Sequence, residues 1–168
     1  EDTLKLLTDE FVAKLIAAAG FFRKMEDVAI QIPALPRPTI AEIQAKFSWI
    51  KSIERDNSPT EAVTLSLGTV LRPDEGSVGG VEYERRIISL PTLGYQQAVW
   101  LVDHQDEFPE FMALLGKVYI DFPGLVVVRE NGDRDVPYLD QGGKRWYLHW
   151  DWLGHGQRSD GRVAVSGK

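Results

Sequence analysis

The sequence contains no cysteine, no long apolar run and no excess of basic residues. Without cysteine, the chain has no disulfide scaffold, no thiolate metal site and no thiol nucleophile. Its apolar runs, such as Gly124 to Val128, are far too short to cross a bilayer, so we expect a chain that is soluble as given and has no transmembrane segment. Lysine and arginine are scattered and the formal net charge is −6, so we expect no nucleic-acid partner.

The overall composition is ordinary for a globular protein. Apolar residues make up 43% of the 168 residues and charged residues 26%, which allows one domain with a real core. We expect an N-terminal helical segment over residues 1–57, packed on a strand-rich domain over residues 58–168. Composition leaves the localisation and the oligomeric state open, and association with a cell or virion surface stays compatible with it.

Helical spacing marks the first part of the chain. An apolar series with three- and four-residue steps runs from Leu4 to Phe22 and predicts an amphipathic helix ending near residues 20–24. After a proline-punctuated link, Thr39 and Glu42 have the spacing of a capping box. The apolar residues that follow predict a second helix from there to about Ile53.

Period-two alternation of apolar residues predicts strands in much of the remaining chain. They cover residues 63–71, 81–90, 118–121, 125–129 and 162–165. A glycine-rich turn joins the first two as a hairpin or meander, and Asn131-Gly132 predicts a tight hairpin turn. Helical spacing returns from Tyr95, and Pro109 and Gly116 suit the start and the end of a second short helix. This order of elements predicts an α+β fold rather than a regularly alternating α/β sheet.

The C-terminal segment from Lys144 to Val165 combines an apolar and a chemically rich pattern. It begins Lys-Arg-Trp-Tyr-Leu-His-Trp-Asp-Trp-Leu, and alternate residues of a strand face opposite sides. One side is expected to form a scaffold of Trp146, Leu148, Trp150 and Trp152. The other side carries Tyr147, His149 and Asp151. The loop from Gly154 to Gly161 adds glycines and several hydrogen-bonding side chains.

Two interpretations of this segment compete. In the simpler one, the tryptophans fill a core and the polar residues face water. That interpretation explains the apolar side, but it explains less well why tyrosine, histidine, aspartate, arginine and serine gather on the other side and in the loop. These residue types suit rigid or adaptable ligand contacts. We therefore interpret the segment as a binding surface.

The alternation of tryptophans with small and polar residues resembles the variable region of proteins diversified by diversity-generating retroelements. In that family, unfaithful copying of adenines turns template Asn codons into many other codons. The resemblance covers about the last quarter of the chain, and its entry, Gly142-Gly143-Lys144-Arg145-Trp146, is only similar to the Gly-Gly-Ser-Trp type that often precedes such regions. Changes at the two adenines of an Asn codon can produce the residue found at each of the following positions: Tyr147, His149, Asp151, Gly154, His155, Gly156, Arg158, Ser159, Asp160 and Gly161.

The resemblance implies a C-type-lectin-like fold for the strand-rich domain and a hypervariable, ligand-binding surface at its C-terminal end. It also implies a receptor-type protein rather than an enzyme, with no cofactor, that recognises a protein or a cell-surface ligand. The expected roles are a rigid contact from Tyr147, pH-sensitive hydrogen bonds from His149 and His155, acceptor charge from Asp151 and Asp160, and a forked donor from Arg158.

Two other functions stay open. Two imidazoles and a carboxylate can hold a divalent metal with a position left for water, so His149, Asp151 and His155 are candidates for a metal-dependent hydrolase. The chain could instead be a structural or assembly protein, for example of viral origin. In that case the helix over Leu4–Phe22 would pair with a partner, and the aromatic residues would only form core.

Overall fold

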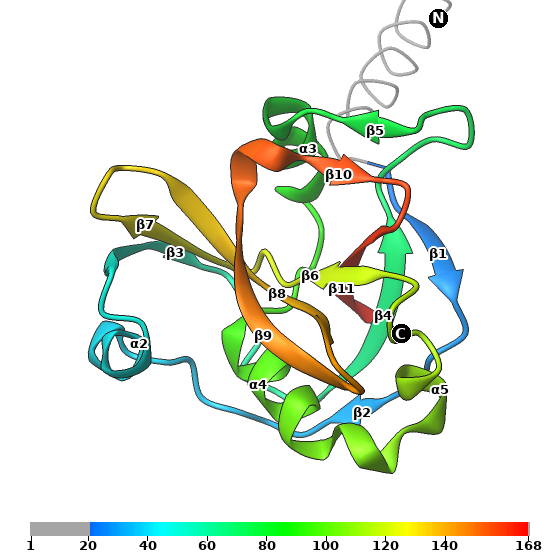
Figure 1. Ribbon diagram of the computed structural model, residues 1–168, viewed down its shortest axis with the longest axis horizontal. Helices are drawn as coiled ribbons and strands as arrows, with labels where there is room; N and C mark the ends of the chain where they lie inside the picture. Colours follow the sequence, from blue (N-terminus) through cyan, green and yellow to red (C-terminus); the bar gives the residue numbers. More distant parts are fainter. Residues whose placement is uncertain (1–20, 168) are drawn as a thin grey trace, which may run out of the picture.

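The computed structural model describes residues 21–167, and a nine-stranded sheet runs through most of that part (Figure 1). The strands of this sheet are β1 (Arg23–Glu26), β2 (Gln31–Ile32), β3 (Ile50–Asp56), β4 (Val63–Thr69), β6 (Tyr119–Asp121), β7 (Leu125–Arg129), β8 (Arg134–Gly142), β9 (Arg145–Trp152) and β11 (Gly161–Gly167). A separate two-stranded sheet joins β5 (Ser77–Val78) to β10 (Gln157–Arg158).

The main sheet has the order β1-β4-β11-β6-β8-β7-β3, with β2 also on β4 and β9 also on β8. The pairs are antiparallel, except that β11 runs parallel to β6. Along one edge, β8 pairs with β9 over its whole length, and along the other it pairs first with β7 and then with β6. Two further strands, β7 and β6, therefore support the hairpin of β8 and β9 by pairing with the other edge of β8.

Short helices cover the sheet at separate places (Figure 1). They are α2 (Ile40–Lys46), α3 (Gly80–Ile87), α4 (Tyr95–His104) and α5 (Pro109–Met112), with 3-10 turns η1 (Gln105–Glu107) and η2 (Leu153–His155). Three groups of buried side chains result: one around α4 and α5, one under α3, and one between α2 and β3. No helix of the described part is both long and apolar enough to cross a membrane.

The helix predicted up to residue 53 is wrong in its second half. Thr39 does cap α2, because its hydroxyl accepts a hydrogen bond from the Glu42 amide at 3.2 Å, but the helix ends at Lys46. Ile50 begins β3 instead, which pairs with β7. Ile50 and Ile53 are both in contact with the third core group from this strand, so β-branched side chains take the extended conformation that they favour.

The strand predicted over residues 81–90 is also wrong, since residues 80–87 form α3. Tyr83 and Ile87 are four residues apart and both are buried against the sheet. Glu82 forms ion pairs with Arg85 at 2.6 Å and with the buried Arg86 at 2.8 Å. These residues are three and four positions apart, the spacing at which charged side chains meet on a helix. The apolar residues of this segment fit both the helical period and the strand period, and the contacts of Tyr83, Ile87 and Glu82 favour the helix.

The predicted division at residue 57 does not separate a helical segment from a strand-rich one. Within residues 21–57, β1 and β2 pair with β4, and β3 pairs with β7. Strands from both sides of the boundary therefore share one sheet. The predicted first helix falls mostly on residues outside the described range, and its expected end overlaps β1.

The other expected elements are present. Residues 63–69, 119–121, 125–129 and 161–167 are strands, and α4 and α5 lie between the first and second of these. Pro109 is the first residue of α5, which ends at Met112, and Gly116 has a φ of 79° shortly afterwards. Gly132, with a φ of 89°, forms the turn between β7 and β8. The mixture of a strand-rich sheet with a few helices agrees with the predicted α+β class.

Candidate functional site

The two faces of the β8–β9 hairpin differ in chemistry, as the alternation of β9 predicts. Directly paired residues of an antiparallel pair project to the same side. On the outer side, Tyr147 lies opposite Asp140 and His149 lies opposite Tyr138. The Tyr138 and His149 rings are 5.8 Å apart, and Tyr147 and His149 are exposed. The outer face thus carries polar and aromatic groups from both strands.

The inner face anchors the hairpin to the helices. Trp146 is completely buried, stacks on Phe111 with ring centroids 4.9 Å apart, and donates from its indole nitrogen to the Phe111 carbonyl at 3.2 Å. Trp150 packs between Phe47 and Tyr95. Leu148 contacts two of the core groups, so these three predicted scaffold residues do face the interior.

Trp152 differs from the other predicted scaffold residues. It is 44% exposed, and its ring lies over Gly154 and against His155. Its partner across the hairpin is Asp135, whose side chain is fully buried beside Arg129. This tryptophan therefore packs over the loop that follows β9 rather than into the interior.

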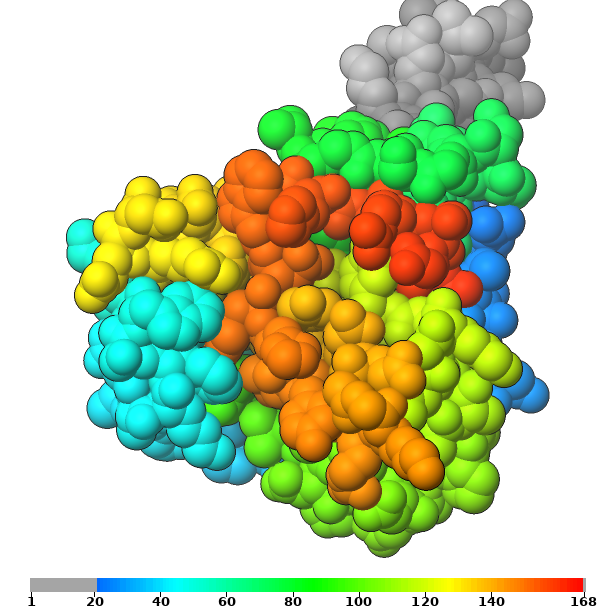
Figure 2. Space-filling view, in the orientation of Figure 1, coloured from blue at the N-terminus to red at the C-terminus, as the bar shows by residue number. Residues whose placement is uncertain are grey.

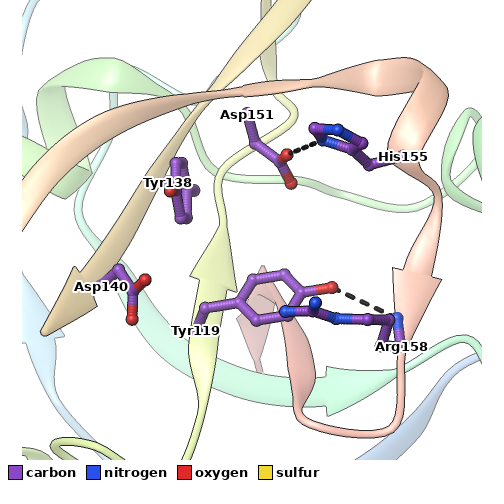
Figure 3. Close-up of a pocket in the computed structure, with 6 residues that line it drawn as sticks. All are labelled: Tyr119, Tyr138, Asp140, Asp151, His155 and Arg158. Atoms are coloured by element: carbon purple, nitrogen blue, oxygen red, sulfur yellow. Dashed lines mark hydrogen bonds and ion pairs between the residues drawn. The ribbon is translucent and has the colours of Figure 1, made fainter.

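A hollow of about 280 Å³ opens beside the outer face of the hairpin. It is lined by Tyr119, Tyr138, Asp140, Asp151, His155 and Arg158 (Figure 3). These residues come from β6, β8, β9, η2 and β10. In the space-filling view β9 and the loop after it form an orange to red band across this side of the molecule, beside the segments of β6 and β8 (Figure 2).

Internal contacts hold four of the lining residues in place. His155 Nδ1 lies 2.9 Å from Asp151 Oδ1, and the Asp151 side chain is only 14% exposed. The backbone amide of Arg158 donates to the Tyr119 hydroxyl at 3.2 Å, and the Arg158 guanidinium lies over the Tyr119 ring at 5.3 Å. Burial raises the pKa of Tyr119 to about 12, so its hydroxyl keeps its proton at neutral pH.

Asp121 lies behind the hollow and is completely buried. It pairs in register with Tyr138 and follows Tyr119 by two residues on β6, so its side chain is on the same side of the sheet as these two tyrosines. Its Oδ2 accepts a hydrogen bond from the Tyr83 hydroxyl at 2.7 Å. Its Oδ1 has no hydrogen-bond donor among the described residues.

The environment of Asp121 favours a protonated carboxyl group. Burial, followed by the charge of Asp151, raises the pKa of Asp121 well above its usual range, and a hydrogen bond with the Asp151 carboxyl acts in the same direction. A protonated Asp121 is itself a hydrogen-bond donor, which suits a site where Oδ1 has no donor. The Tyr83 hydroxyl donates to Asp121, and Asp151 is hydrogen-bonded to His155.

The structure brings together some of the predicted binding residues and not others. Asp151, His155 and Arg158 line the hollow, while Tyr147 and His149 lie on the adjoining strand face. Ser159 and Asp160 are exposed in the turn before β11, and Asp160 lies 3.4 Å from the Arg158 guanidinium. Each of these seven positions is either accessible to a ligand or next to a position that is accessible.

The glycines of the predicted set have packing roles. Gly156 is buried with a φ of 68°, and a Cβ atom there would overlap the Val78 carbonyl oxygen. A Cβ atom at the buried Gly161 would lie 2.6 Å from the Tyr119 hydroxyl, and one at the exposed Gly154 would overlap the Trp152 ring. Gly156 and Gly161 therefore cannot carry a side chain without movement of their neighbours, which makes them poor positions for diversification.

Sequence reasoning missed the side of the hollow built by the upstream strands. Tyr138 and Asp140 alternate on β8, and Tyr119 and Asp121 alternate on β6. The polar-aromatic alternation of both pairs was visible in the sequence. Their approach to β9 depends on pairing that no local pattern specifies.

The predicted metal-ligand set is not assembled. Asp151 and His155 are joined, but His149 packs against Tyr138 and does not line the hollow. Within residues 21–167, no three histidine or acidic side chains are grouped closely enough to hold a metal ion. No protein-family model matches the chain, and neither a curated protein nor a solved structure matches it.

Proposed function

We propose that this chain is a non-enzymatic, receptor-type binding protein that recognises a protein or cell-surface ligand through the outer face of β8–β9 and the loop that follows. The observation that carries the proposal is the convergence of two residue groups on one hollow. Asp151, His155 and Arg158 come from the C-terminal segment, while Tyr119, Tyr138 and Asp140 come from upstream strands. Concave sites with a few convergent polar groups are the usual form of ligand sites.

The rigidity of the support favours recognition over a merely solvated surface. Trp146, Leu148 and Trp150 fix the hairpin from its inner face. The exposed side chains of Tyr147 and His149 project from this fixed backbone, and that of Arg158 projects from β10, which pairs with β5. Side chains on a rigid backbone lose less conformational entropy on binding than side chains on a mobile loop, because the backbone is already ordered.

Diversification by a retroelement and a C-type-lectin-like topology are the finer parts of the proposal. The antiparallel pairing of β4 with β11 joins the two ends of the segment from residue 63 to 167, which contains α3, α4 and α5, and this pairing supports a lectin-like arrangement. The exposed positions 147, 149, 155, 158, 159 and 160 have room for other side chains. Variation would be confined to these positions and Asp151, with Gly156 and Gly161 retained by packing.

Peptide selection against the intact chain tests the binding surface. Random phage-displayed peptides are selected on the wild-type protein and then measured on two triple variants. One combines Tyr147→Ala, His149→Ala and Arg158→Ala. The control combines Lys46→Ala on α2, Ser48→Ala in the turn after it and Lys51→Ala on β3. We expect the first variant to lose about tenfold or more in affinity, since truncating residues at the centre of an interface usually costs above 1 kcal/mol.

The control variant should bind the selected peptides like the wild type. Equal binding to all three proteins, or a loss confined to the control variant, would place recognition elsewhere and refute the proposed surface. The diversification part has its own test in the neighbouring DNA. A reverse-transcriptase gene and a near-copy of the 3′ coding end, differing mainly at adenines, should be present there, and their absence would remove the retroelement from the proposal.

A further inference from the structure

The charges around the hollow are not balanced. Arg158 is paired with Asp160, at 3.4 Å, and His155 is paired with Asp151, at 2.9 Å. Asp140 also lines the hollow, and its carboxylate accepts a hydrogen bond from the Gln141 amide at 2.8 Å. No cationic side chain within residues 21–167 forms an ion pair with it. One wall of the hollow therefore carries an uncompensated negative charge.

The Asp151 carboxyl group adds to this acidic character. Asp151 lines the hollow, and the neighbouring Asp121 is fully buried with no hydrogen-bond donor for its Oδ1 among the described residues. Together with Asp140, the carboxyl groups exceed the one permanent cation of the lining, Arg158, which Asp160 already neutralises.

The aromatic rings beside Asp140 favour the same kind of ligand. The Tyr119 and Tyr138 rings stand nearly perpendicular, at 89°, with centroids 6.2 Å apart. Aromatic faces attract cations through their quadrupole, and perpendicular rings with a nearby carboxylate are a known way to hold an ammonium group. The Tyr119 ring already has a cation of the chain over it, the Arg158 guanidinium at 5.3 Å.

We propose that the hollow binds an alkylammonium group, such as the end of a lysine side chain presented by the ligand, between Tyr138, Asp140 and Asp151. This inference rests on the proposed binding surface and names the chemistry of its central contact. Asp140 supplies the counter-charge and Tyr138 an aromatic wall. His155 and Arg158 border the side of the hollow opposite Tyr138 and Asp140 (Figure 3), so the ammonium group sits away from the Arg158 guanidinium.

Two small probes that differ in charge test this assignment. N-acetyl-lysine methylamide carries the ammonium group, and N-acetyl-norleucine methylamide is a neutral counterpart with a similar aliphatic stem. Each is titrated into the full ¹⁵N-labelled chain at equal ionic strength, and amide chemical shifts are recorded. The lysine probe should cause saturable shifts in β6, β8 and β9, and the norleucine probe should bind at least several-fold more weakly, because it gains neither the cation–π contact nor the ion pair.

Matched variants then locate the contact. Asp140→Asn should weaken binding of the lysine probe by about twofold to fivefold, as expected for one partly exposed charge contact. Asp74→Asn removes the same charge from the exposed turn before β5 and should leave binding unchanged. Tyr138→Leu should weaken binding by a similar factor through loss of the aromatic face. The amide spectra report whether each variant keeps the fold.

Equal affinities for the two probes, or equal effects of Asp140→Asn and Asp74→Asn, would overturn the ammonium site. The absence of any saturable shift in β6, β8 and β9 would do the same. None of these results would affect the recognition surface if selected peptides still require Tyr147, His149 and Arg158. Conversely, peptides that ignore these three residues would refute the surface even if the lysine probe enters the hollow.

Discussion

At the scale of single residues, Asp121 and Tyr83 are two hydrogen-bonded groups whose pKa values burial raises well above the ordinary values. The raised pKa of Asp121, caused first by burial and then by Asp151, means that the folded protein holds a proton that the unfolded chain releases near pH 4. Above that pH, folding takes up a proton, so this group makes the folded state less stable as pH rises, by about 1.4 kcal/mol per pH unit until the folded carboxyl also ionises.

Asp121→Asn removes this pH dependence without removing the hydrogen bonds. The amide oxygen can accept from Tyr83 and the amide nitrogen can donate to Asp151, so the packing stays filled. We predict that the variant gains stability relative to the wild type as pH rises from 4 to 8, measured by urea unfolding at several pH values. A difference between the two proteins that does not change with pH would show that Asp121 is ionised in the fold.

The tryptophans of β9 should contribute unequally to stability. Trp146→Phe leaves a gap beside Phe111 and removes the donor to the Phe111 carbonyl. We expect a loss of about 2–4 kcal/mol in the free energy of unfolding. Trp152→Phe is the matched change at a position that is 44% exposed, and it should cost about 1 kcal/mol or less. Similar losses of stability at both positions would contradict the conclusion that Trp146 supports the core while Trp152 only packs over the loop.

At the scale of elements, the turn at Gly156 determines how β10 meets β5. Its φ of 68° and ψ of −143° belong to a region that only glycine occupies readily. Gly156→Ala would push a methyl group into the Val78 carbonyl, and we expect a loss of about 3 kcal/mol or more in stability. Gly143→Ala is the control, because its φ of 65° is similar but its surroundings are open, and about 1 kcal/mol is expected there.

Thermal unfolding of the two glycine variants makes the comparison. A small effect of Gly156→Ala, equal to that of Gly143→Ala, would mean that the loop adapts and that position 156 could be diversified after all. The proposed restriction of variation to the exposed positions would then be withdrawn.

Elements with strong local signals could be predicted from the sequence. Asn131-Gly132 defines its hairpin because only residues that tolerate positive φ suit that turn. Pro109 begins α5 because its missing amide proton costs nothing in a first helical turn. The alternation of β9 correctly separated Trp146 from Tyr147. Each of these features depends on a few neighbouring residues.

Other elements could not be predicted because local pattern and tertiary packing disagree. Residues 50–53 and 81–87 have apolar residues that suit either period, and only their partners decide: β7 for the first and the sheet face under α3 for the second. The hollow was missed in part for the same reason. Tyr119 and Asp121 lie on a strand distant in sequence from β9, and only sheet order brings them to Asp151.

At the scale of the whole molecule, the sheet joins both ends of the described chain. β1 and β2 pair with β4, and β3 pairs with β7, so residues 23–56 cover core side chains such as Val63 and Leu125. We predict that a fragment of residues 58–168 does not fold, because it lacks three strands and exposes this apolar surface. Cooperative urea unfolding of that fragment would contradict the shared sheet.

The central claim is that the outer face of the β8–β9 hairpin, with its hollow, is where this protein meets its ligand. Chemical-shift mapping with one peptide selected on the intact wild-type chain tests it most directly. The amides of residues 138–140 and 147–160 should shift on saturation, while those of α2 and α4 should stay in place. Shifts concentrated on α2 and α4, with the hairpin unchanged, would contradict the claim.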